Sequence, residues 1–244
     1  MSESEAAAAP PRQRTVSDRV RGRVNRGLQG VGVQTWGTKS FEFWTLLAAA
    51  LWIVRPHSLL ELGSGRSTSY LGDYAQKEGA KLVSIEQNRG FARRVRVALR
   101  AGFVDPGCVH HVPVRGGWYD LDRVRSLAPR PCDLLFVDGP TGEQESLGSA
   151  TRTDAAAVQW LLSVAAETRA LVVDDLQRPV NVELAHELAV AAEAETLYID
   201  YAPQPGARNV AMVAVARQHS SALRSACADV GIAVYFDREL VAGG

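Results

Sequence analysis

Short apolar runs alternate with longer amphipathic segments along most of the chain. The apolar runs predict β-strands at about 58–63, 81–86, 108–113, 133–138 and 170–174. The segments that follow them repeat apolar residues at helical spacing and predict helices at about 67–78, 89–101, 118–127, 151–167 and 180–193. Strands that alternate with helices favour an α/β fold, with a mostly parallel, doubly wound sheet and helices on both faces.

The two ends of the chain depart from this alternation. Two strand-like runs at 195–201 and 209–216 are joined by a Pro/Gly turn with no room for a helix, so we expect them to pair antiparallel. A short helix near 220–228 and a last apolar run at 232–236 follow. At the other end, the pattern predicts a helix over 41–54, which Pro56 stops.

These patterns divide the chain into three parts. Residues 1–14 lack hydrophobic periodicity and predict a flexible tail. Residues 15–56 form a helical segment, whose apolar helix carries Trp44 and Trp52; these two side chains could serve the core or a homodimer interface equally well. Residues 57–244 form the α/β domain.

The charge of the chain is balanced. Its 27 basic and 27 acidic residues leave a formal net charge of +0, so the molecule as a whole does not attract nucleic acid or an anionic membrane. No apolar stretch reaches the ~20 residues that a membrane-spanning helix needs, and the polar start does not resemble a secretory signal. We therefore expect a cytoplasmic protein without a nucleic-acid or membrane partner.

The first predicted strand ends in a glycine-rich turn, within the sequence LLELGSGRSTSYL. Gly63 and Gly65 permit a sharp turn and the close approach of a ligand to the backbone. The helix that begins near Ser67 points its N-terminal N–H groups toward the same place, which suits a nucleotide-like ligand or a carboxylate. The dinucleotide fingerprint does not fit, because Thr68 occupies the position of its third glycine.

Acidic residues follow three other predicted strands. Glu86 ends the second strand, where a carboxylate can accept hydrogen bonds from both hydroxyls of a ribose. Asp138 ends the fourth strand, and Asp174 and Asp175 end the fifth. In a parallel sheet all of these strand ends lie at the same edge as Gly63, so we expect one site there.

The glycine-rich turn resembles Glu/Asp-x-Gly-x-Gly-x-Gly, the first motif of class I S-adenosylmethionine-dependent methyltransferases, with Ser67 in place of the last glycine. The stretches VDGP and VVDDLQR and the terminal strand pair resemble a bacterial branch of this family related to small-molecule O-methyltransferases. The resemblance implies a Rossmann-like, seven-stranded sheet with an antiparallel last strand. It also implies methyl transfer from S-adenosylmethionine to a small-molecule acceptor. We expect the methylated group to be a hydroxyl rather than an amine, and the reaction to belong to natural-product biosynthesis.

The resemblance also implies roles for single residues. The turn would hold the methionine part of the cofactor and Glu86 its ribose, while Trp118 either stacks on the adenine or anchors the next helix in the core. Asp138 or Asp175 would be the catalytic base. The expected cofactor-binding residues are Thr38, Glu61, Gly63, Ser64, Gly65, Ser67, Thr68, Glu86, Gln87, Trp118 and Asp138.

A divalent metal ion is a further implication of the resemblance. In catechol-type relatives, an aspartate after the fourth strand and an Asp-Asn pair after the fifth bind the metal that orients the acceptor oxygen. Asp138, Asp174 and Asp175 stand at these positions, with Asp175 where the asparagine would be, and their hard oxygen atoms suit Mg²⁺. Two other functions stay open: an enzyme that binds S-adenosylmethionine without methyl transfer, and a non-catalytic nucleotide-binding scaffold subunit.

Overall fold

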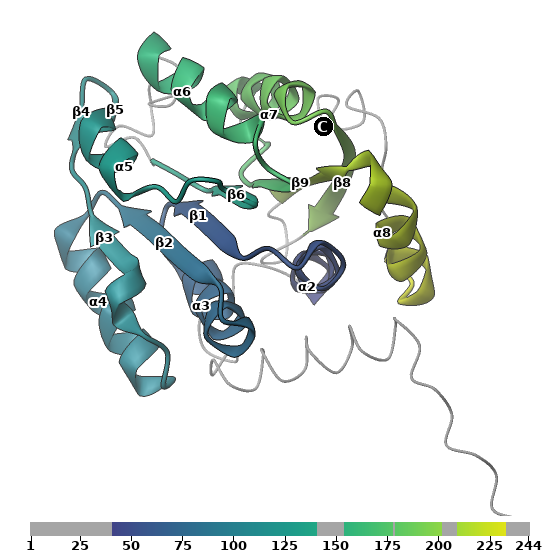
Figure 1. Cartoon of the computed structure of the whole chain (residues 1–244), viewed down its shortest axis with the longest axis horizontal. Helices are drawn as coiled ribbons and strands as arrows, with labels where there is room; N and C mark the ends of the chain where they lie inside the picture. The colour runs from purple at the N-terminus through teal and green to yellow at the C-terminus, as the bar shows by residue number, and fades with distance from the viewer. Residues whose placement is uncertain (1–40, 141–153, 178, 202–208, 233–244) are drawn as a thin grey trace, which may run out of the picture.

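The computed structural model describes residues 41–140, 154–177, 179–201 and 209–232 (Figure 1). The predicted tail at 1–14, most of the 15–56 segment with Thr38, and most of the last apolar run lie outside the described residues. Within the described part of the chain, no helix combines the length and the apolar character needed to cross a membrane.

A seven-stranded sheet forms the centre of the fold (Figure 1). Its strands are β1 (Ser58–Leu62), β2 (Lys81–Glu86), β3 (Val109–His111), β6 (Leu134–Val137), β7 (Ala170–Val173), β8 (Ala194–Tyr201) and β9 (Asn209–Ala216). The strand order is β3-β2-β1-β6-β7-β9-β8, and β9 runs antiparallel to both of its neighbours. The sheet confirms the predicted fold class, including the antiparallel pairing of the last two strands.

Helices cover both faces of the sheet (Figure 1). They are α2 (Phe41–Val54), α3 (Arg66–Glu78), α4 (Arg89–Ala101), α5 (Leu121–Leu127), α6 (Ala155–Ala165), α7 (Pro179–Ala191) and α8 (Arg217–Asp229). Side chains of α2, α3 and α8 share one hydrophobic core with the sheet, whereas those of α5, α6 and α7 share another. Successive strand residues alternate between the two cores, as Leu59 and Leu60 do, because side chains of a strand point to opposite faces.

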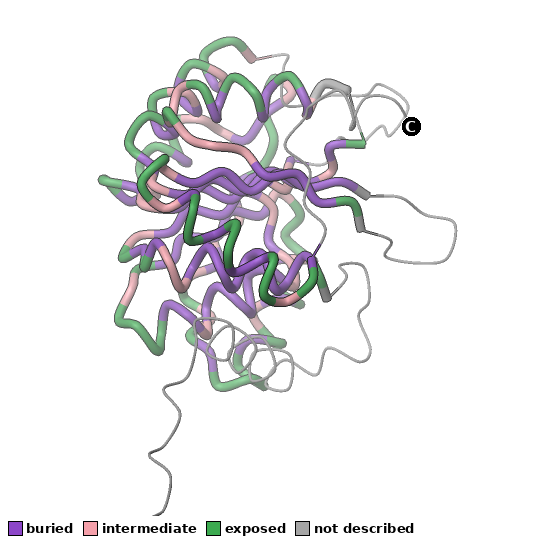
Figure 2. Tube along the Cα trace, turned by 90° about the vertical axis from the view of Figure 1, so that its right-hand side faces the viewer, coloured by how far each residue is buried: buried purple, intermediate pink, exposed green. Residues whose placement is uncertain are grey.

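The central strands are buried on both faces. Figure 2 shows them as a buried layer between helices whose outer sides are exposed. All four residues of β6 and all four of β7 are buried, which explains why these strands read as continuous apolar runs and not as alternating patterns. Polar side chains cap the N-termini of two of these helices. Asn88 accepts a hydrogen bond from the Phe91 N–H at the start of α4, and Asp154 caps α6 in the same way.

One predicted helix begins later than expected. Residues 114–119 form a hairpin of two short strands, β4 (Val114–Arg115) and β5 (Trp118–Tyr119), so the helix expected at 118–127 starts at Leu121. The turn of this hairpin consists of Gly116 and Gly117, whose φ angles are +63° and +91°. Two adjacent glycines with positive φ are typical of the tight turns that join antiparallel strands, so the sequence did contain a signal for the hairpin.

Asp133 connects the starts of β1, β6 and β7 by hydrogen bonds. Its Oδ2 accepts hydrogen bonds from the N–H groups of His57 and Ser58 at 2.8 and 3.2 Å, and its Oδ1 accepts one from Arg169 Nε at 3.1 Å. Burial alone would raise the pKa of Asp133, but these hydrogen bonds and the Arg169 charge hold it below its usual range. The starts of β1, β6 and β7 are thereby held in register.

Candidate active site

The predicted site residues meet at one edge of the sheet because β1, β2, β6 and β7 are parallel neighbours. The strand order turns at β1, with β2 on one side and β6 on the other, so the connections after β1 and β6 leave toward opposite faces. Such a switch point opens a crevice beyond the carboxyl ends of the strands, and ligands of doubly wound sheets bind there. Gly63, Glu86, Asp138 and Asp174 all lie at this edge.

The turn after β1 lies directly against the end of β6. Gly63 has a φ of +94°, and a Cβ on it would lie 2.5 Å from the carbonyl oxygen of Asp138. Both the backbone conformation and the contact therefore require glycine. A Cβ on Gly65, by contrast, would have no other atom of the described residues within 4 Å, so that side of the turn faces open space within this part of the chain.

Glu61 stabilises this turn from inside the fold. Its Oε2 accepts hydrogen bonds from Thr68 Oγ at 2.7 Å and from Ser84 Oγ at 2.5 Å. Thr68 Oγ in turn accepts one from the Gly65 N–H at 2.7 Å, which connects the turn to the first residues of α3. Glu61 and Thr68 are each 0% exposed, and their hydrogen bonds stabilise the turn from inside the fold.

The sequence patterns did not indicate that Ser84 supports the site. It faces the interior from the buried strand β2, where it holds Glu61. A hydroxyl in the middle of an apolar strand needs a partner when buried, and that was the signal available in the sequence KLVSIE.

Glu86 ends β2 with its carboxylate beside the glycine-rich turn. Ser64 Oγ donates a hydrogen bond to Glu86 Oε2 at 3.2 Å, and the Asn88 N–H donates one to Oε1 at 2.7 Å. Only 6% of Glu86 is exposed, and this burial raises its pKa, although the hydrogen bonds oppose the rise. Each carboxylate oxygen has lone pairs for a further donor, so Glu86 can still accept hydrogen bonds from a ligand.

The start of α3 provides donors beside the same turn. The first N–H groups of a helix have no partner within the helix, and they carry partial positive charge. Ser67 lies in this first turn with 1% exposure, and within the described part of the chain its hydroxyl has no hydrogen-bond partner. A buried hydroxyl without a partner at a helix N-terminus suits a bound anionic group.

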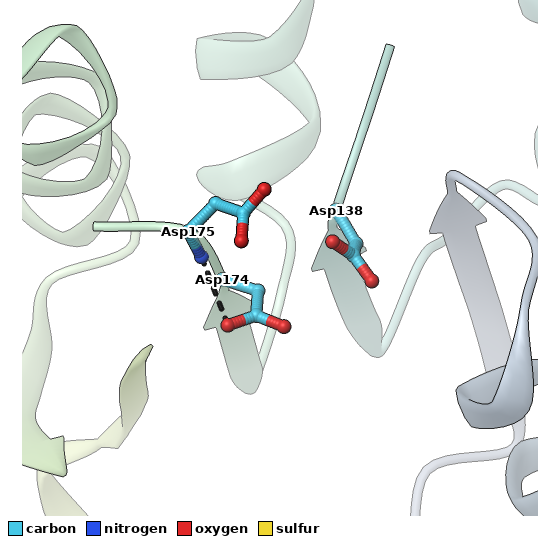
Figure 3. A group of neighbouring side chains, drawn as sticks. All are labelled: Asp138, Asp174 and Asp175. Atoms are coloured by element: carbon cyan, nitrogen blue, oxygen red, sulfur yellow. Dashed lines mark hydrogen bonds between the residues drawn. The ribbon is translucent and has the colours of Figure 1, made fainter. Parts of the chain in front are cut away.

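Three carboxylates converge at the ends of β6 and β7 (Figure 3). Oxygen atoms of Asp138, Asp174 and Asp175 lie within 4.8 Å of one another. Asp174 is buried, and its Oδ1 accepts a hydrogen bond from the Asp175 N–H at 2.8 Å. Asp175 has a φ of +59°, a conformation that is uncommon outside glycine and that recurs at functional sites.

Side chains of the following segment hold Asp175 in this conformation. Gln177 Nε2 donates a hydrogen bond to Asp175 Oδ1, and Asn181 Nδ2 donates one to the Asp175 carbonyl oxygen, both at 3.0 Å. The structure therefore brings together the three acids that the sequence predicted, and it adds two amide side chains that the sequence did not indicate.

Trp118 lies in the core and not on the surface of the crevice. Its ring is 0% exposed and packs against Tyr119 and Trp160, at centroid distances of 5.3 and 5.8 Å. Of the two alternatives for this residue, the structure favours the core anchor, because the hairpin turns its ring inward. Gln87 follows Glu86 directly and is half-buried. Thr38 lies outside the described residues.

A family model described as "Methyltransferase domain" matches residues 60–176. This range begins in β1, includes the turn, Glu86 and Asp138, and ends just after Asp175. Residues 60–176 of the chain therefore match a methyltransferase domain. The sheet, with β9 antiparallel between β7 and β8, has the architecture that the sequence led us to expect for class I methyltransferases.

Solved structures resemble this chain at low identity. The cofactor-bound protein Rv0187 from MTB is 19% identical, with a TM-score of 0.48 and coverage of 84% of this chain and 99% of that chain. A putative O-methyltransferase from Klebsiella pneumoniae is 18% identical, with a TM-score of 0.48 and coverage of 86% and 92%. TomG from Streptomyces achromogenes, an O-methyltransferase of tomaymycin synthesis, is 18% identical, with a TM-score of 0.47 and coverage of 80% and 89%. At these scores the likenesses identify no substrate, and no curated protein matches this chain.

Proposed function

We propose that the protein transfers a methyl group from S-adenosylmethionine to a hydroxyl group of a small molecule. The observation that carries the proposal is the position of Glu86, a buried carboxylate at the end of β2 beside a glycine-rich turn, inside a methyltransferase domain. The family match supports methyl transfer, and the acceptor and the residue roles are our inference from the site.

The residues around the turn fit the cofactor. Glu86 would accept hydrogen bonds from the ribose hydroxyls, and the neighbouring Gln87 would contact the nucleoside. The open side of Gly65 lets a ligand reach the backbone, since none of the described residues has an atom within 4 Å of where its Cβ would be. Ser67 and the N-terminal N–H groups of α3 would bind the carboxylate of the methionine part. Gly63, Ser64, Glu61 and Thr68 would act by shaping the turn.

S-adenosylmethionine supplies a methyl group already activated by its sulfonium charge. The chain's own task is then to orient the acceptor and to exclude water, and such positioning can lower a barrier by about 7–11 kcal/mol. Asp138 belongs to the acidic cluster, and its backbone lies against the turn after β1, so its carboxylate, or that of Asp175, would take the proton from the acceptor hydroxyl.

The acidic cluster also fits a divalent metal ion. Three carboxylates within 4.8 Å of one another form the hard oxygen donor set that Mg²⁺ prefers, and they would repel one another without a cation between them. Asp138, Asp174 and Asp175 would hold the ion, whose charge would favour loss of the acceptor proton. The same residues would keep the acceptor oxygen close to the cofactor side of the crevice.

Calorimetry with S-adenosylhomocysteine and S-adenosylmethionine tests cofactor binding. Wild-type protein should bind both, and Glu86→Ala should raise the dissociation constant by about 10- to 100-fold, the effect of losing hydrogen bonds to a charged group. Glu86→Gln keeps the shape of the side chain, and its dissociation constant should lie between those of the wild type and Glu86→Ala. Asp122→Ala is the matched control, because the Asp122 side chain is 96% exposed on α5. Absence of binding by the wild-type protein would refute the proposed function.

Product analysis tests methyl transfer itself. The protein is incubated with methyl-deuterated S-adenosylmethionine and a panel of hydroxylated natural products, and mass spectrometry follows both products. Our proposal expects labelled methyl ethers together with one equivalent of S-adenosylhomocysteine. Conversion of a substrate without S-adenosylhomocysteine would instead support an enzyme that uses the cofactor without methyl transfer.

A further inference from the structure

Tyr119 is a buried side chain at the site to which neither the sequence motifs nor the proposed mechanism gives a role. It lies on β5, the second strand of the small hairpin, and pairs with Val114. Its residue is 1% exposed, and its ring contacts that of Trp118, which in turn contacts Trp160 of α6. These contacts fix the ring, so the position of the hydroxyl at its end is fixed as well.

The hydroxyl of Tyr119 lies where the turns after β1 and β6 meet. A Cβ on Gly139 would lie 2.7 Å from Tyr119 Oη and 3.0 Å from the Cα of Gly63. The turns are therefore in van der Waals contact, and the phenol oxygen fills the space that a side chain at position 139 would take. Gly63 belongs to the cofactor side of the crevice and Asp138, next to Gly139, to the acceptor side.

The electrostatic surroundings keep this hydroxyl neutral. Burial raises the pKa of Tyr119 well above its usual value, and the charges of Glu86, Asp138 and Glu61 raise it further, although a backbone hydrogen bond at Gly63 opposes the rise. The group is therefore an O–H dipole at physiological pH. A buried hydroxyl of this kind contributes through fixed hydrogen bonding and packing, and not through a change of charge.

We infer that Tyr119 is a positioning residue: its hydroxyl sets the distance between the turn after β1 and the turn after β6, and so the distance between the cofactor and Asp138. This inference rests on the proposed function. Three contacts support it. The hydroxyl lies against the position of Gly139 and against the backbone of Gly63, and the ring packs against Trp118.

Tyr119→Phe removes the oxygen and keeps the ring. The matched control is Tyr198→Phe, because Tyr198 is also a buried tyrosine in the same core, at 3% exposure, but on β8 near the far edge of the sheet. Both variants are melted and titrated with S-adenosylhomocysteine. We expect Tyr119→Phe to weaken binding about fivefold to tenfold, the effect of about one hydrogen bond, and Tyr198→Phe to change it less than about twofold at a similar loss of thermal stability.

A double-mutant cycle tests the geometry independently of binding. Gly139→Ala should lower the melting temperature less in the Tyr119→Phe background than in the wild type, because the oxygen that its methyl group meets at 2.7 Å is gone. Additive effects would overturn the placement of the hydroxyl. Wild-type affinity in Tyr119→Phe, or equal weakening in Tyr198→Phe, would overturn the positioning role while the wild type still binds. Failure of the wild type to bind refutes the proposed function instead.

Discussion

Replacing Gly63 by alanine tests the close contact between the turn after β1 and the end of β6. A side chain at a φ of +94° strains the backbone by about 1–3 kcal/mol. The new Cβ would also lie 2.5 Å from the carbonyl oxygen of Asp138 and 2.7 Å from its carbon, and relief of such an overlap costs about 1–3 kcal/mol more. We therefore expect the free energy of unfolding to fall by about 2–6 kcal/mol.

Thermal and urea unfolding, followed by circular dichroism, measure this loss. For a chain of this size, each kcal/mol corresponds to about 2–4 °C, so the melting temperature should fall by at least about 4 °C. Gly65→Ala is the matched control, because Gly65 has an extended φ of −173° and, among the residues that the structure describes, no neighbour within 4 Å of its Cβ position. It should melt within about 2 °C of the wild type. Its methyl group would nevertheless enter the space meant for the cofactor and weaken S-adenosylhomocysteine binding.

Two results would refute this reasoning. If Gly63→Ala unfolds at the same urea concentration as the wild type, the turn does not press against Asp138. The cofactor side and the acceptor side of the site are then not in contact there. If Gly65→Ala binds S-adenosylhomocysteine as tightly as the wild type, the open side of the turn is not the wall of the cofactor site.

Three further predictions follow from charged groups. Burial raises the pKa of Glu86, and only its ionised form accepts hydrogen bonds through both oxygens. The affinity for S-adenosylhomocysteine should therefore fall as the pH drops through this raised pKa. Calorimetry should show that this dependence of affinity on pH is weaker in Glu86→Gln. The pKa of Asp133 is lowered, so its contribution is complete above the unfolded pKa of ~3.9 and is lost as the pH falls through the folded pKa. Asp133→Ala should therefore lower the free energy of unfolding by about 1–3 kcal/mol at neutral pH, because the His57 and Ser58 N–H groups lose their charged acceptor. The difference from the wild type should shrink in acid, and a constant difference in urea unfolding would contradict this. Asp174→Asn should weaken Mg²⁺ binding about tenfold, and unchanged calorimetric affinity would argue against a metal at the cluster.

Most of the fold could be predicted from local pattern. The central strands are covered on both faces, so their apolar runs are continuous and easy to recognise, and the helices between them repeat apolar residues on one side. The prediction is wrong at residues 118–120: the pattern predicts a helix from residue 118, whereas Trp118 and Tyr119 form β5. Their pairing with Val114 and Arg115 is a contact between strands, which the helical spacing of apolar residues does not reveal.

The strand ends identified the candidate site, but they did not assign the tasks of its residues. Gly63, Glu86 and the aspartates at 138, 174 and 175 were found because a parallel sheet places all its carboxyl ends at one edge. Whether a side chain at that edge points into the crevice or into the core depends on neighbours from other strands. Glu61 lies on the same face of β1 as Leu59, and Ser84 and Thr68 donate hydrogen bonds to it there. The sequence of β1 does not reveal these two partners.

The amino-acid sequence by itself determined the order of strands and helices, the glycine-rich turn and the acids that follow the strands. These properties depend on residues that are near one another along the chain, through backbone sterics and the period of apolar positions. Only the tertiary structure decided that Trp118 packs inside, that Gly63 touches Asp138, and that the hydroxyl of Tyr119 lies between the two turns. Such contacts join residues from separate strands, and dense packing of the assembled core selects which of them form.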